Sequence, residues 1–142
     1  MITVESSIVI ARSVSDVYAF VSDQTNEPMW HTDILEIRSA GGPAAGLGSN
    51  WLVTVQFMGR KEYRMQVTGL DPSLRVELTT TAGWLRPTTT YLLEPANGST
   101  RFTRRVDIPV DGALRIMNPL MQRMAVKRNA AFVKNLKQVL EA

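Results

Sequence analysis

The sequence predicts a single α+β domain, residues 1–142, in which a curved, seven-stranded antiparallel sheet wraps around a long C-terminal helix. Apolar residues alternate with a period of two from Trp51 to Ile108, with turn residues about every ten positions. A helical period follows, from about Leu114 to Ala142. Two short helical segments stand between the first and second predicted strands.

The N-terminal elements follow from local patterns. Residues 2–10 alternate apolar and polar side chains, which predicts a half-buried strand. Ser13 with Asp16 three residues later is typical of a helix start, and the apolar spacing carries that helix to about Ser22. Residues 26–28, Asn-Glu-Pro, can open a second helical turn. Both helices are too short to be stable alone, so they must dock on the sheet or the long helix.

The other strands are delimited by turns. Ile34–Arg38 is predicted as the second strand, and the glycine-rich residues 40–48 as a loop. Proline and Asn-Gly pairs are preferred in turns because they fix φ near −65° or tolerate positive φ. The predicted breaks between the later strands are Gly59-Arg60, Asp71-Pro72-Ser73, residues 83–87 and Pro95-Ala96-Asn97-Gly98.

The last element is the longest helical pattern in the chain. Asn118 and Pro119 suit a cap and a first helical position. About 23 residues at about 1.5 Å each make a rod of roughly 34 Å, long enough to cover a sheet. We expect the two short helices to brace it, and a cavity to remain between the rod and the curved sheet. The apolar stripe predicted to face the sheet is Met117, Met121, Met124, Ala125, Phe132, Leu136 and Val139.

Composition limits the function. The 142 residues include 44% hydrophobic and 20% charged side chains, no cysteine, and a net charge of +3 spread along the chain. We therefore expect no nucleic-acid partner, no integral membrane span and no signal peptide, and a cytoplasmic location. One histidine without cysteine predicts no metal site, and no cofactor motif is present, because Gly46-Leu47-Gly48 precedes a strand and lacks the third glycine of a dinucleotide fingerprint.

Several stretches in this order resemble the START-like (SRPBCC, helix-grip) superfamily, in its polyketide cyclase/dehydrase and lipid-transport branch. The resemblance covers nearly the whole chain and implies a deep, mainly apolar cavity between helix and sheet for a hydrophobic or amphipathic small molecule. A fold shared so widely does not assign a reaction. The stretches are IVIARSVSDVYAFVSD, NEPMWHTDI, GPAAGLGSNW, GSTRFTRRVD and the final NLKQVLEA.

Candidate ligand-binding residues are the side chains expected to face this cavity. Methionine is flexible and suits an irregular apolar guest, and tyrosine hydroxyls can orient one. Ordinary core packing is the alternative for each. The candidates are Phe57, Tyr63, Met65, Tyr91, Phe102, Arg104, Met117, Met121, Met124 and Arg128.

Arg104 and Arg128 interrupt the apolar pattern. A buried guanidinium needs an anion or a route to water, so either could meet a ligand carboxylate or phosphate, or else pair internally. Trp84, in a turn, is a candidate lid over the cavity. His31 is a weak catalytic candidate that Asp33 could orient, and Glu27, Asp33 and Glu36 are expected to be solvated.

The predicted function is binding of a hydrophobic or amphipathic small molecule in the cavity. One alternative is a cyclase/dehydratase-like enzyme acting on an aromatic or polyketide-type substrate, which would be favoured if His31 lay buried beside Asp33. The other is a protein–protein interaction module, which a solid core would favour. A homodimer stays open, and the sequence does not identify the ligand.

Overall fold

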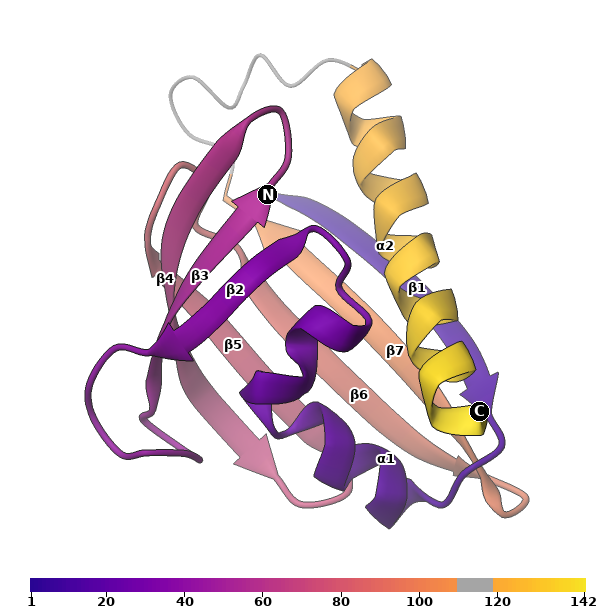
Figure 1. Cartoon of the computed structure of the whole chain (residues 1–142). Helices are drawn as coiled ribbons and strands as arrows, with labels where there is room; N and C mark the ends of the chain where they lie inside the picture. The colour runs from indigo at the N-terminus through magenta and orange to yellow at the C-terminus, as the bar shows by residue number, and fades with distance from the viewer. Residues whose placement is uncertain (110–118) are drawn as a thin grey trace.

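A computed structural model describes residues 1–109 and 119–142. Its sheet has seven antiparallel strands in the order β1-β7-β6-β5-β4-β3-β2, so each strand from β2 to β7 pairs with its sequence neighbour and β1 closes onto β7 (Figure 1). The fold class and the order of elements predicted from the sequence are confirmed. The strands are β1 (Ile2–Ile10), β2 (Ile34–Ser39), β3 (Asn50–Gln56), β4 (Arg60–Asp71), β5 (Arg75–Ala82), β6 (Thr88–Ala96) and β7 (Ser99–Ile108).

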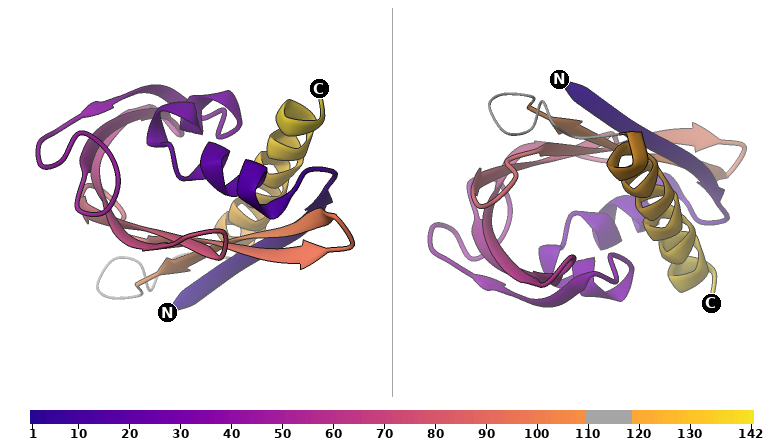
Figure 2. Two further views of the ribbon diagram at one scale, coloured as in Figure 1. Left: turned by 90° about the horizontal axis from the view of Figure 1, so that it is seen from below. Right: turned by 90° about the horizontal axis from the view of Figure 1, so that it is seen from above.

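Among the described residues, three helices lie on the concave side of the sheet, which is strongly curved (Figure 2). α1 (Val14–Val21) packs on β6 and β7, and the 3-10 helix η1 (Gln24–Met29) packs on β2. The Ser13 hydroxyl accepts a hydrogen bond from the Asp16 amide at 3.2 Å, as the predicted cap requires. The expected bracing of the long helix comes through Trp30, after η1, whose carbonyl accepts a hydrogen bond from Asn135 Nδ2 at 3.2 Å.

The long helix α2 (Pro119–Glu141) crosses the edge of the sheet formed by β1 and β7. Its buried residues, Asn129, Phe132, Val133 and Leu136, are confined to the segment 129–136. The predicted stripe is therefore wrong at Met124, which is 37% exposed. Met117 and Asn118 lie outside the described residues.

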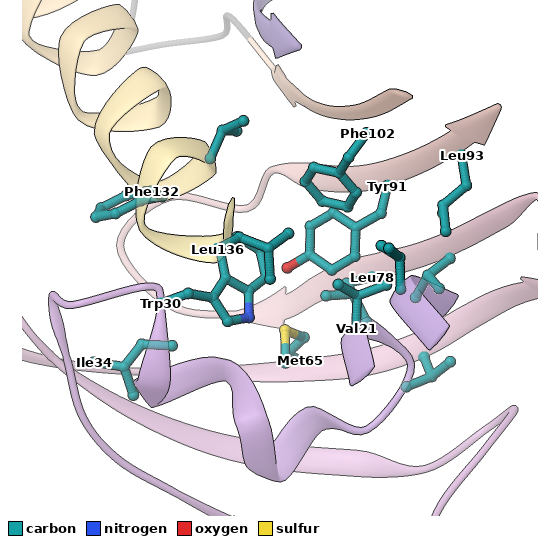
Figure 3. Close-up of a cluster of buried hydrophobic side chains, with 14 of the residues drawn as sticks. Val21, Trp30, Ile34, Met65, Leu78, Tyr91, Leu93, Phe102, Phe132 and Leu136 are labelled. Carbon is teal, nitrogen blue, oxygen red and sulfur yellow. The ribbon is translucent and has the colours of Figure 1, made fainter. Parts of the chain in front are cut away.

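The core fills the end of the molecule where α1, η1 and the C-terminal half of α2 meet the sheet. Trp30 is its centre: the side chain has no exposed surface and meets Tyr91 and Phe102 edge-on, with ring centroids 5.3 and 6.1 Å away (Figure 3). This packing fixes the end of η1 against β6 and β7. The polar residues of η1 are thereby brought to the centre of the fold.

Candidate functional site

A cavity of about 240 Å³ lies between the concave face of the sheet, η1 and α2. Its wall is mainly apolar, with side chains such as Val55, Met65 and Leu78 from the sheet and Phe132 from α2. A cavity of about 150 Å³ is enough for benzene, and 240 Å³ corresponds to about eight waters at about 30 Å³ each. The space is large enough for a small organic molecule.

Glu27 is the most unusual group in this wall. It belongs to η1, is 3% exposed, and accepts a hydrogen bond of 2.6 Å from the Tyr91 hydroxyl. Burial raises the pKa of Glu27 from 4.5 to about 7, although the Tyr91 hydrogen bond and the positive charge of Arg104 partly offset this. A carboxyl group of this kind can hold or release a proton near neutral pH.

Arg104 on β7 is 8% exposed and lies directly across the ladder from Tyr91 on β6. Its Nη1 donates to Asn129 Oδ1 at 2.6 Å, and Asn129 Nδ2 donates to the Arg104 carbonyl at 3.1 Å. The guanidinium carbon lies 5.5 Å from the centre of the Phe132 ring. Its Nε has no hydrogen-bond partner among the described residues.

Arg128 on α2 differs from Arg104 because it is paired with a carboxylate. Its Nε donates to Asp33 Oδ2 at 3.0 Å and its Nη2 donates to Asp33 Oδ1. The guanidinium also lies 4.8 Å from the centre of the Phe57 ring. The charge of Arg128 is thus balanced inside the protein.

His31 follows η1 and stacks on Phe132, with ring centroids 4.1 Å apart. Burial, and next the positive charge of Arg104, lower the pKa of His31 well below its ordinary value of 6.5. The imidazole is therefore neutral at pH 7, and its Nδ1 has no partner within the described part of the chain. Asp33 also lines the cavity, but its carboxylate is held by Arg128 instead of by His31.

Trp84 marks the border between the cavity and solvent. It lines the cavity and is nevertheless 53% exposed, with Lys61 Nζ 5.3 Å from the centre of its ring. The preceding Gly83 has a φ of 148°, and a Cβ there would lie 2.7 Å from the Tyr63 Cβ. The turn that carries Trp84 can therefore approach β4 closely only with glycine at this position.

The structure brings most of the predicted site residues to one cavity. Phe102 lies in the core, with no exposed surface, and neither Met121 nor Met124 belongs to the wall. Met117 lies outside the described residues. The candidates that do line the cavity are His31, Phe57, Tyr63, Met65, Trp84, Tyr91, Arg104 and Arg128.

Sequence reasoning missed Glu27, Asp33 and Asn129, which all line the cavity. The expectation that Glu27 is solvated is wrong, because η1 turns it under Tyr91. Asp33 is half-buried and paired with Arg128. Asn129 carried a usable signal, since it stands four residues after Ala125 and three before Phe132, on the inward face of the helix.

A curved antiparallel sheet closed by a C-terminal helix over an internal cavity defines a START-like, helix-grip domain. The family model described as "Polyketide cyclase / dehydrase and lipid transport" matches residues 1–141, and the chain belongs to this family. None of the curated proteins compared with the chain matches it significantly. Within the described residues, no helix combines the length and hydrophobicity that a membrane crossing requires.

Solved structures similar to this chain share its fold at low sequence identity. A START superfamily protein from Mycobacterium smegmatis has 16% identity and a TM-score of 0.83, over 98% of this chain and 97% of that one. The Zhui aromatase/cyclase from Streptomyces sp. R1128 has 14% identity and a TM-score of 0.76, over 99% and 93%. Ginseng major latex-like protein 151 from Panax ginseng has 9% identity and a TM-score of 0.80, over 99% and 97%.

Proposed function

We propose that this protein binds a small hydrophobic or amphipathic molecule in the cavity between α2 and the sheet. The observation that carries the proposal is the cavity of about 240 Å³, with a mainly apolar wall that also holds a few polar groups. Burying about 200 Å² of apolar ligand surface offers roughly 5 kcal/mol before the costs of association. Polar contacts must therefore add to burial for tight binding.

Membership of a family described by cyclase, dehydrase and lipid-transport functions supports a ligand of this kind. The rival functions have weaker support. An enzyme built on His31 needs an orienting partner, and Asp33 is held by Arg128 instead. A protein–protein module called for a solid interior between helix and sheet, whereas this interior contains a cavity.

The test is to fill the cavity. Ala125 faces it from α2, so Ala125→Phe is expected to occupy much of the ligand's space and to weaken binding of 1-naphthamide, a neutral aromatic probe, at least tenfold. Isothermal titration calorimetry measures this. Ala131→Phe, on the exposed face of the same helix, is the matched control and should bind like the wild type. Equal affinity of both variants would contradict the proposal.

A further inference from the structure

The cavity wall holds a buried positive charge that no carboxylate of the described residues pairs with. Among the described residues, Arg104 is in none of the ion pairs within 4 Å. Its side chain instead interacts with two neutral groups, the Asn129 amide and the Tyr91 hydroxyl. A buried guanidinium without a directly bonded carboxylate is costly, because it loses water and gains only the more distant charge of Glu27. The Arg104 side chain lines the cavity, and its Nε is buried without a partner among the described residues.

Glu27 is the acidic group that faces Arg104, and other groups surround it. Tyr91 on β6 donates to it, and the positive charge of Arg104 on β7 lowers its pKa. The Glu27 charge in turn raises the pKa of Tyr63 on β4. His31, after η1, is neutral at pH 7. The Asp33–Arg128 pair joins the residues after η1 to α2 and is internally balanced.

We propose that the ligand is a small hydrophobic acid, whose carboxylate binds Arg104 while its apolar body fills the cavity and Glu27 takes up a proton. This inference rests on the proposed function and adds the chemical class of the ligand. A planar guanidinium matches a carboxylate in geometry and charge. Arg128 cannot serve in the same way, because Asp33 already occupies its fork.

Proton uptake follows from charge balance. A ligand carboxylate beside Arg104 replaces Glu27 as its counter-charge and repels the Glu27 carboxylate. Since the pKa of Glu27 in the empty protein is about 7, binding above pH 7 requires one proton. The dissociation constant for the acid should therefore rise about tenfold between pH 6 and pH 8. Uptake of one proton changes it tenfold per pH unit, but only above the pKa of about 7.

The experiment compares 1-naphthoate with 1-naphthamide, a neutral probe of nearly the same shape, by isothermal titration calorimetry at pH 6 and pH 8. Wild-type protein is expected to prefer naphthoate at least tenfold at pH 6. Arg104→Met should lose this preference and still bind naphthamide. Arg101→Met, at an exposed position of the same strand, is the matched control and should keep it. Glu27→Gln should keep the preference and lose the pH dependence.

The outcomes separate this inference from the proposed function. Suppose that naphthamide binds and Ala125→Phe blocks it, but the wild-type protein shows no preference for naphthoate. The ligand is then not an acid, whereas binding of a hydrophobic molecule in the cavity is supported. If Arg104→Met keeps the preference, Arg104 is not the anion site. Should Arg104→Met fail to fold, two measurements still test the inference. They are the preference of the wild type for naphthoate and the loss of the pH dependence of naphthoate binding in Glu27→Gln. The inference is overturned if the wild type shows neither a preference for naphthoate nor a pH dependence that Glu27→Gln removes.

Discussion

Replacing Trp30 with alanine is expected to lower the free energy of unfolding by about 3–5 kcal/mol, the range for removing a large aromatic side chain from a core. Trp30 has no exposed surface and lies edge-on against Tyr91 and Phe102 (Figure 3). Urea denaturation followed by circular dichroism measures the loss. Because Trp30 follows η1 directly and anchors it, the same change should also make the position of Glu27 under Tyr91 less fixed.

The matched control for Trp30 is Trp84, the same residue type with 53% of its surface exposed. Trp84→Ala is expected to cost less than about 1 kcal/mol, since a surface substitution leaves no buried void. A loss for Trp30→Ala as small as that for Trp84→Ala would mean that Trp30 does not anchor the core.

Glu27→Gln is expected to become more stable than the wild type as the pH rises, with a gain of about 3 kcal/mol between pH 4 and pH 9. Burial raises the pKa of Glu27 from 4.5 to about 7, and each pKa unit is worth about 1.4 kcal/mol. Near pH 4 both folded and unfolded wild-type chains carry the proton. Between 4.5 and 7 the unfolded chain loses it first, so wild-type stability falls, and above 7 the penalty is constant.

The measurement is the difference in free energy of unfolding between wild type and Glu27→Gln at several pH values. His31 acts in the opposite direction, because its lowered pKa makes stability fall as the pH drops below 6.5, but it is present in both proteins and cancels. Glu94→Gln, at an exposed position of β6, is the control for a surface carboxylate. A flat difference for Glu27→Gln would contradict a buried, destabilised carboxyl group.

The fold was predictable because its local signals agree with one another. Alternation of period two marks the strands, and Asn97, with a φ of 52°, supplies the positive φ that the last hairpin needs. Because side chains alternate between the two faces of a strand, the apolar set of each strand must point to the same face of the sheet. This is why Tyr91, Met65 and Arg104 were correctly placed on the inner face.

The parts of the site that were missed depend on tertiary placement. Asn26-Glu27-Pro28 reads locally as a polar turn, and only the anchoring of Trp30 carries Glu27 under Tyr91. Met124 has the right helical spacing but is exposed, because the buried residues of α2 lie only in the segment 129–136. Helical periodicity gives the direction of a side chain, whereas the distance of the helix from the sheet decides its burial.

The central claim is that the space between α2 and the concave sheet admits a hydrophobic guest. The most direct measurement is the bromine position in crystals of the protein grown with 1-bromonaphthalene, read from anomalous scattering. We expect one strong site inside the cavity, between Met65 and Phe132, in wild type and none there in Ala125→Phe. Bromine bound only on the outer surface, or an empty interior at saturating ligand, would contradict the claim.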